Sequence, residues 1–546
     1  MTTLDLAIVV AYLLGIMAVG ILAGYRKSVS SQQFFLAGKT LRWPMIGAAL
    51  FTANISTIHL VGLASAGFEV GVVVGNFEWM ACFCLLLLGL VFVPFYLKSG
   101  ITTLPEFLEK RYNTTCRMIT AAVAIFSALL VHIGVSMYAG ALVFEHFFDI
   151  PPMVSIVVIA AVTAIYTILG GLKAIVVTDT IQAVLLLGGC VLLTLMAVFK
   201  LPDAGIHSLA DLKAVVGPGH LSMIHSMRKP DGSFNEFSWL TVMFGYHVLG
   251  IWYWCTDQTI VQKTLGAKTE RDGALGAAFA GALKILPLFF MVLPGVFGYA
   301  LFRNQIGDDP NNTLIVLIDE LLPVGLKGLF AAGLLAAVMS TVESALNSTA
   351  TVTAEDLVKR LWPQTKDRTL VLIGRITAGV VIVLAMLWSP YCGKFNSIFE
   401  VINKVPMMFA PAITTVFILG VFWSRGTKEA AVATFITGVA AGLVYFLVDL
   451  PRDTMVDGVL QENYQLVANG LGIPFMMMGL FLLALCVTVY VIVSFLTPAP
   501  VKELEAIHWQ PPMQAILHNR FAGMTDPRLV AVVLIGVMTV LYYLFR

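Results

Sequence analysis

The chain has 546 residues, of which 59% are hydrophobic and only 12% are charged, and its formal net charge is +1. Soluble domains average about 25% charged residues, so this composition indicates an all-α polytopic protein of the lipid bilayer. A net charge near zero, with no block of like charges, excludes nucleic acid as a partner. The seven cysteines are scattered without the spacing of a zinc site or a disulfide framework. We expect them to pack as small hydrophobic side chains.

Apolar runs of about 20 residues, each long enough to cross the bilayer once, predict about fourteen transmembrane helices. They begin near residues 4, 44, 77, 117, 152, 174, 237, 275, 326, 370, 397, 429, 470 and 528. The first run lacks the basic leader and cleavage site of a signal peptide, so we expect it to remain as a helix.

Lysine and arginine are unevenly distributed among the loops between the predicted helices. The loops within residues 26–42, 98–111, 263–271 and 359–368 are richer in them than the loops between. The positive-inside rule places the richer loops in the cytoplasm and both termini outside. The short loops favour a multi-pass protein of the plasma membrane, in this case a bacterial inner membrane.

Two of the predicted helices are interrupted by polar residues or glycines. The helix from residue 44 is interrupted at Asn54–Thr57, and the helix from residue 237 is interrupted at Gly245–Gly250. Broken helices at corresponding places in two halves of a chain point to a binding site at the bilayer midplane. We therefore expect one membrane domain, residues 1–546. Its parts are a peripheral helix and loop (1–43), a first inverted repeat (44–199), an external segment (200–236), a second repeat (237–425) and peripheral C-terminal helices (426–546).

Several apolar runs carry polar side chains that a simple membrane helix does not need. Recognition of a sugar requires donors and acceptors for its hydroxyls and an aromatic plate for its apolar face. The candidates are His59, Glu78, Lys284, Asn403 and the aromatic run 252–254. Alternatives remain open: Glu78 can favour a helix dipole, Trp252 can belong to an interfacial belt, and Lys284 can snorkel.

A second polar group lies in the run AAVMSTVESALNST, residues 336–349. Ser340, Thr341, Glu343 and Ser344 fall on adjacent turns of one predicted helix. Hydroxyls with freed carbonyls suit a monovalent cation, although hydroxyls can instead bond back to their own helix. Asp179, in VVTDTIQ, is another carboxylate in an apolar run, and its alternative role is a helix cap.

Five longer segments carry a more specific signal. They are NISTIHLVGLASAGFEVGV from residue 54, KSGITTLPEFLEKRY at 98–112, YTILGGLKAIVVTDTIQ at 166–182, WYWCTDQTIVQKTLGAK at 252–268 and SALNSTATVTAEDL at 344–357. Together they resemble the sodium/solute symporter family, specifically its sodium/glucose cotransporter branch, over most of residues 25–425. The resemblance implies a LeuT-type fold of 5+5 inverted repeats, with about fourteen helices, that works by alternating access.

The resemblance also implies roles for individual residues. His59, Glu78, Lys284 and Asn403 match positions that contact sugar in that family, and Tyr253 matches an aromatic gate beside Trp254. Asn403 stands where glutamine is typical, and Gly250 stands where asparagine or threonine is typical. The main sodium site implied by the resemblance consists of the carbonyls of Thr52, Ile55 and Ala337 and the hydroxyls of Ser340 and Thr341.

A second cation site is implied by Asp179, Ser340 and Ser344, which match family members that couple a second sodium ion. Glu343 departs from them, because a hydroxyl residue is typical at its position. Two carboxylates in a medium of low dielectric constant attract a cation, so we expect Asp179 and Glu343 to hold sodium or a proton. The alternative is that Glu343 faces a water-filled exit and binds nothing.

The sequence thus predicts a sodium-driven symporter for a monosaccharide of the glucose or galactose type. Alternatives are the same fold carrying myo-inositol or sialic acid and, from other classes, a sugar sensor or a channel. We expect no enzyme, since no set of nucleophile and base or of metal ligands is visible, and no organic cofactor. Sodium is expected as a co-transported ion, and the oligomeric state is not predicted.

Overall fold

The computed structural model describes residues 1–24, 30–229, 232, 234–394, 404–456, 459–507, 509–518 and 523–546. Within these ranges, ten helices are long and apolar enough to cross a membrane, or eleven if one bent pair forms a single span. The expected helical, polytopic architecture is therefore confirmed, while the total of fourteen spans stays a prediction. The described residues contain one sheet, the antiparallel hairpin of β1 (Arg452–Val456) and β2 (Val459–Tyr464).

The helices follow one another along the chain with few long connections. In order they are α1 (Thr3–Gly24), α2 (Ser31–Phe35), α3 (Trp43–Asn54), α4 (Thr57–Val70), α5 (Asn76–Leu87), α6 (Val93–Lys98), α7 (Leu104–Arg111), α8 (Thr114–Ser127), α9 (Ser136–Phe148), α10 (Pro152–Lys200), α11 (Leu209–Val216), α12 (Tyr246–Ile251), α13 (Gln258–Leu265), α14 (Glu270–Leu283), α15 (Leu293–Ile306), α16 (Thr313–Leu321), α17 (Leu326–Thr351), α18 (Lys359–Leu361), α19 (Asp367–Trp388), α21 (Ala410–Phe422), α22 (Lys428–Val448), α23 (Phe475–Leu496), α24 (Lys502–Ala506), α25 (Pro512–His518) and α26 (Pro527–Leu544).

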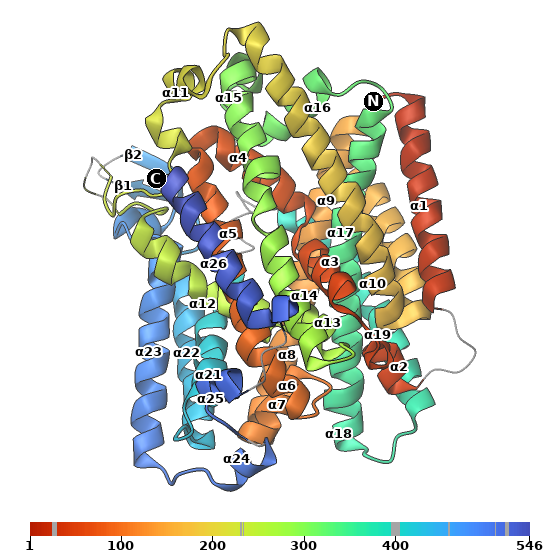
Figure 1. The fold of residues 1–546 in the computed structure, drawn as a ribbon, viewed down its shortest axis with the longest axis vertical. Coiled ribbons are helices and arrows are strands. Elements are labelled where there is room, and N and C mark those ends of the chain that lie inside the picture. The colour runs from red at the N-terminus through yellow and green to blue at the C-terminus, as the bar shows by residue number, and fades with distance from the viewer. Residues whose placement is uncertain are drawn as a thin grey trace.

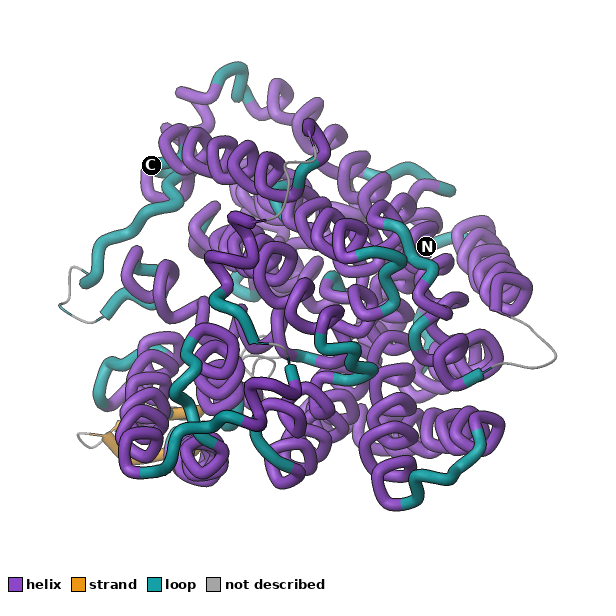
Figure 2. Tube along the Cα trace, turned by 60° about the horizontal axis from the view of Figure 1, so that its bottom comes forward, coloured by secondary structure: helices purple, strands orange, loops and turns teal. Residues whose placement is uncertain are grey.

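Helix α17 lies deep in the bundle. Every residue from Phe330 to Thr351 is buried, because α1, α3, α10 and α19 all pack against this helix. By contrast, α1 and α26 bury few of their residues, as expected for helices that face lipid. Figures 1 and 2 show this bundle from two directions. Polar side chains on α17 are consequently shielded from both lipid and bulk water.

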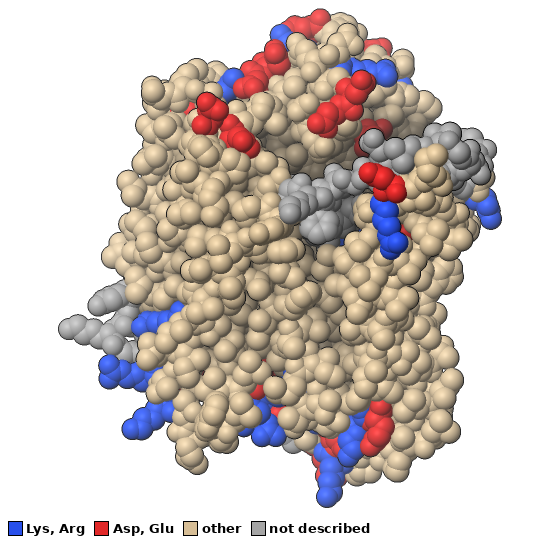
Figure 3. Space-filling model, turned by 180° about the vertical axis from the view of Figure 1, so that it is seen from behind, with Lys and Arg blue, Asp and Glu red and all other residues tan. Residues whose placement is uncertain are grey.

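Charged side chains gather toward the two ends of the bundle. On the face shown in Figure 3, a broad belt between these ends consists largely of uncharged residues. Both chain ends lie toward the same end of the molecule (Figure 1). There the amino terminus donates a hydrogen bond to the carbonyl of Phe147 (3.1 Å), and the amide of Met223 donates to the carbonyl of Phe545 (2.7 Å). The bundle thus has the charge distribution of a membrane-embedded protein.

Glycine 171 divides α10 into two segments. Its φ of +60° lies in the left-handed region, and a Cβ added there would lie 2.5 Å from the carbonyl oxygen of Phe34, so both backbone angle and space require glycine. The two segments correspond to the helices expected from residues 152 and 174. Asp179 lies inside the second segment, well past its start, so the interpretation of Asp179 as a helix cap is wrong.

The first predicted helix break is confirmed, and the second is misplaced. The segments Trp43–Asn54 and His59–Val70 meet at an angle of 64°. The chain stays helical through Tyr246–Ile251 and a π-helical turn at 252–256, and leaves the helix at Asp257 with ψ of 124°. Gly250 instead allows close packing, since a Cβ there would lie 2.6 Å from the ring of Tyr246. A glycine in an apolar helix can therefore mark a tight contact instead of a break.

Candidate functional site

The break between α3 and α4 orients His59. Ile55 and Ser56 have extended backbone angles, and Ser56 then caps α4. The amide of Ser56 donates to Nδ1 of His59 (3.3 Å), and Oγ of Ser56 lies 3.1 Å from the same nitrogen. Because an amide can only donate, Nδ1 must accept, and the ring proton of the neutral histidine belongs on Nε2. His59 lines a cavity in the middle of the bundle, as predicted.

Lys284 and Glu78 form a buried ion pair at this cavity. The ammonium of Lys284 lies 2.5 Å from Oε2 of Glu78, and their side chains are 0% and 4% exposed. Lys284 also donates a hydrogen bond to Oδ1 of Asn54 and lies over the ring of Trp254, 5.3 Å from its centre. Lys284 therefore does not snorkel to the membrane surface. Glu78 does lie in the first turn of α5, as expected, but its carboxylate is paired with the lysine.

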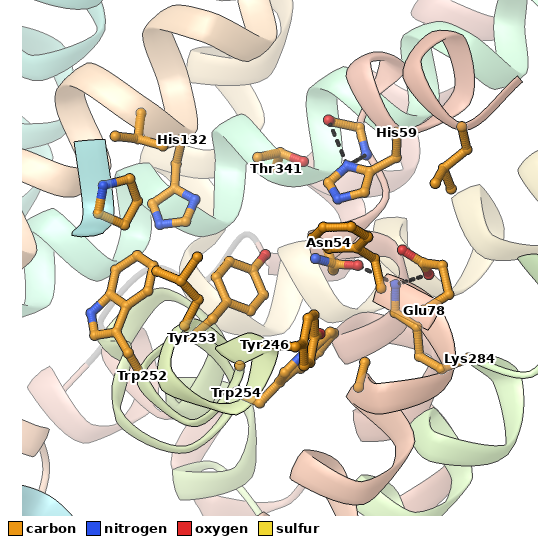
Figure 4. Close-up of a pocket in the computed structure, with 18 of the residues that line it drawn as sticks. Asn54, His59, Glu78, His132, Tyr246, Trp252, Tyr253, Trp254, Lys284 and Thr341 are labelled. Carbon is orange, nitrogen blue, oxygen red and sulfur yellow. Dashed lines mark hydrogen bonds and ion pairs between the residues drawn. The ribbon is translucent and has the colours of Figure 1, made fainter. Parts of the chain in front are cut away.

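Aromatic side chains form another part of the wall, next to the ion pair. Tyr253 packs edge-on against Trp254, with ring centres 5.0 Å apart, and Nε1 of Trp254 donates to the hydroxyl of Tyr246 at 3.4 Å. Trp252 is only 5% exposed, so it belongs to the core and not to an interfacial belt. Figure 4 shows Tyr253 between His132 on one side and Asn54, Glu78 and Lys284 on the other. The cavity has a volume of about 130 Å³.

The structure brings together five of the six residues predicted for the solute site. They are His59, Glu78, Tyr253, Trp254 and Lys284, and all five line the cavity. The sixth, Asn403, lies outside the described residues. Gly250 and Pro406 line the same cavity.

Two further residues near the cavity were missed. His132, which lines the cavity, has Nε2 at 3.0 Å from Oδ2 of Asp257 at the second helix break. The sequence signal was present, because both are ionisable residues inside predicted membrane helices.

The residues predicted for the main sodium site meet where α17 passes the first break. The hydroxyl of Thr341 lies 3.2 Å from the carbonyl oxygens of both Ala53 and Ala337. Thr52 directly precedes Ala53 and Ile55 lies two residues after it, and both are fully buried. Ser340 donates a hydrogen bond to Oδ1 of Asp179. The arrangement supplies hydroxyl and carbonyl oxygens from two elements, which are the ligands that a hard monovalent cation prefers.

The carboxylates predicted for a second cation also meet. The hydroxyl of Thr178 lies 3.2 and 3.0 Å from the two carboxylate oxygens of Glu343. Glu343 and Asp179 are both 0% exposed, so Glu343 does not face a water-filled exit in this conformation. Oδ2 of Asp179 has no hydrogen-bond partner.

A lysine that the sequence analysis missed belongs to this cluster. Lys263 is 1% exposed, and its ammonium donates to Oγ of Ser344 at 2.7 Å. Lys263 had been counted in the basic loop 263–271 and in the family motif 252–268, but its side chain lies inside the bundle and not in a loop. The cluster therefore combines two carboxylates with one ammonium.

A helical membrane bundle with a broken span, and with polar side chains around a cavity at the break, has the architecture of a secondary transporter. Comparison with known proteins agrees. The model of the sodium:solute symporter family matches residues 34–438. The chain belongs to this family, whose members are sodium-coupled solute transporters.

Two named cotransporters are among the proteins similar in sequence. Sodium/glucose cotransporter 4 of Danio rerio is 32% identical over 534 residues, covering 92% of this chain and 80% of the relative. Sodium/myo-inositol cotransporter 2 of Oryctolagus cuniculus is 31% identical over 528 residues, covering 92% and 78%.

Two solved structures share the fold. A sodium-coupled sialic acid symporter in a substrate-bound, outward-open state aligns with a TM-score of 0.77 and 21% identity, covering 92% of this chain and 99% of that one. Mhp1, a transporter of the nucleobase-cation-symport-1 family, aligns with a TM-score of 0.52 and 13% identity, covering 89% and 99%.

Proposed function

We propose that the protein is a secondary active symporter that couples inward sodium flow to the uptake of a monosaccharide of the glucose or galactose type. The observation that carries this proposal is the buried Lys284–Glu78 ion pair, which lies on one side of Asn54, with Tyr253 on the other side (Figure 4). Each sugar hydroxyl both donates and accepts hydrogen bonds, and this group supplies an ammonium, a carboxylate and an amide. The ring of Tyr253 offers a flat apolar surface for the CH face of a pyranose.

A neutral solute suits the charge of this site. The ammonium of Lys284 is already neutralised by Glu78 at 2.5 Å, so the pair offers no free positive charge to an anionic solute. An acidic sugar such as sialic acid would place its carboxylate in a cavity lined by Glu78, where like charges repel. The charge balance therefore favours an uncharged sugar.

Sodium would act on the first helix break. A cation held by Thr52, Ile55, Ala337, Ser340 and Thr341 would tie α17 to the break, and the break also carries Asn54 of the solute cavity. Sodium binding would thereby favour the conformation that receives the sugar, and rocking of the two repeats would then expose both ligands to the other side.

A larger cavity at one end of the bundle supports a proposed orientation. A second cavity, of about 990 Å³, is lined by residues that include Glu69, His220, Asn235 and Asn311. Helices α4 and α9 line both cavities, because they also carry His59 and Ser136 of the solute cavity. We place this end, the external segment and both chain termini outside the plasma membrane of a bacterium, with about fourteen spans in all.

A second candidate solute is myo-inositol. Relatives named sodium/glucose and sodium/myo-inositol cotransporters are similarly close to this chain, at 32% and 31% identity. Myo-inositol is also an uncharged ring of hydroxyls with CH faces, so the same chemistry recognises it. Competition by unlabelled myo-inositol against labelled glucose separates the two.

The decisive experiment is uptake of labelled glucose, galactose and myo-inositol into proteoliposomes, driven by an inward sodium gradient or by a proton gradient. We expect sodium-dependent accumulation of one of these solutes and its loss in Lys284→Ala and Ser340→Ala. Failure of sodium to drive uptake of all three into liposomes containing folded protein would refute the proposed substrate class.

A further inference from the structure

His132 and Asp257 form a buried pair on the wall of the solute cavity. Nε2 of His132 lies 3.0 Å from Oδ2 of Asp257, and each side chain is 6% exposed. The ring of His132 also lies 5.8 Å from that of Tyr253. Both partners therefore lie next to the aromatic wall of the solute site, although neither takes part in the Lys284–Glu78 pair.

The pair lies between two cavities. His132 lines the solute cavity, while Asp257 lines a smaller cavity of about 10 Å³ together with Leu104 and Thr120. Trp252 lines both cavities. Leu104 and Thr120 belong to α7 and α8, and α7 lies at the end of the bundle opposite the chain termini (Figure 1). The pair therefore stands between the solute cavity and a small space beside α7 and α8, on the side of the cytoplasmic end in the proposed orientation.

Asp257 can release His132 without losing its helix. Its Oδ1 accepts a hydrogen bond from the amide of Thr259 at 2.7 Å and so caps α13, while Oδ2 faces His132. Asp257 also provides the helix break itself, where backbone rotation is possible without disrupting a helical hydrogen-bond ladder. His132 and Asp257 belong to different proposed repeats, 44–199 and 237–425, so relative motion of the repeats changes their separation.

We infer that His132 and Asp257 are the gate residues that close the inner side of the solute cavity, and that their separation opens the route along α7 and α8. The inference rests on the proposed function for its direction of transport. The hydrogen bond between His132 and Asp257 is buried, where such bonds contribute most to holding two elements together. Its removal should raise the population of the open state by about tenfold or more.

A thiol in the solute cavity tests this gate without any knowledge of the solute. Ser136 lines the cavity, so Ser136→Cys provides the reporter, and a membrane-impermeant maleimide is added from the cytoplasmic face of inverted vesicles. The seven native cysteines are buried, and the parent protein without the reporter gives their background. We expect the labelling rate to rise about tenfold when His132→Ala or Asp257→Asn is added.

Two comparisons keep the result specific. Asp257→Asn retains an oxygen that can cap α13, so faster labelling in this variant is not explained by loss of the helix. Thr256→Ala is the matched control, because Thr256 lines the same small cavity but donates only to the carbonyl of Trp252 at 2.7 Å. Unchanged labelling in both gate variants, or equal acceleration in Thr256→Ala, would overturn the inference. Accelerated labelling without sodium-driven sugar uptake would refute the proposed sugar and leave the gate standing.

Discussion

The ammonium of Lys284 is completely buried and lies 2.5 Å from the carboxylate of Glu78, on a different helix. Neither charge has access to bulk water, so each depends on the other. This pair joins the end of α14 to the start of α5 at the edge of the solute cavity. We therefore expect removal of one partner to lower stability and to impair the proposed solute recognition.

Lys284→Ala should abolish solute uptake and lower the free energy of unfolding by roughly 3–5 kcal/mol, the usual cost of leaving one member of a buried ion pair alone. The double variant Glu78→Gln, Lys284→Met removes both charges and should recover most of the stability without recovering uptake. Thermal unfolding in detergent and uptake into proteoliposomes measure the two effects. Equal instability of the single and double variants would contradict this account.

Thr341→Ala should raise the half-saturating sodium concentration about tenfold, since one hydroxyl ligand contributes about 1–1.5 kcal/mol. The control is Thr349→Ala, on the same helix. Thr349 is equally buried, and its hydroxyl donates to the carbonyl of Ala345 at 2.8 Å. Sodium dependence of initial uptake rates, measured in both variants, checks the prediction. A similar rise of the half-saturating sodium concentration in the two variants would contradict a specific role of Thr341, because loss of any buried hydroxyl in α17 would then weaken sodium binding.

Glu343→Gln should reduce the number of cations that move with each solute from two to one. When all three groups are ionised, Asp179, Glu343 and Lys263 carry one net negative charge, which a second monovalent cation can balance. Without the charge of Glu343, the ammonium of Lys263 already balances Asp179. Reversal potentials in proteoliposomes give the stoichiometry. A ratio of one in the parent protein, unchanged by the substitution, would disprove a second cation site.

Acidification should destabilise the protein partly through Glu109, on α7 outside the membrane spans. Burial alone would raise the pKa of this carboxyl, but hydrogen bonds from Arg117, Thr114 and Arg360 outweigh it and lower the pKa below its usual 4.5. Because folding lowers the pKa of Glu109, the ionised carboxylate stabilises the folded state at any pH above the pKa of the unfolded chain. This contribution disappears as the pH falls through the lower pKa of the folded state. Glu109→Gln should therefore show a weaker fall of the unfolding temperature with acidification. Asp203→Asn, in an exposed pair with Lys200, serves as the control.

The sequence allowed prediction of the chemistry of the cavity better than of its geometry. Lys284 and Glu78 were recognisable because charged residues are rare in apolar runs, and their cost in the membrane implies partners. The position of the second break was not recognisable from the sequence. Glycine has a low helix propensity, so Gly250 suggested a break, whereas in the structure Gly250 lies within a helix and allows close packing against Tyr246. Asp257, which ends the helix, lies in the segment 252–268, which was interpreted only by its resemblance to the family. Lys263 was missed because its partner, Ser344, comes from α17, which is distant in sequence.

The first helix break places two neighbouring residues in contact with different sites. Asn54 accepts a hydrogen bond from Lys284 at the solute cavity, whereas the preceding carbonyl, that of Ala53, accepts one from Thr341 beside the expected sodium ligands. We therefore expect binding at the two proposed sites to be coupled. Thermodynamic reciprocity requires that if sodium increases the affinity for the solute by some factor, the solute increases the affinity for sodium by the same factor. A bound solute would then delay the departure of sodium, and the ion would leave more readily once the sugar has gone.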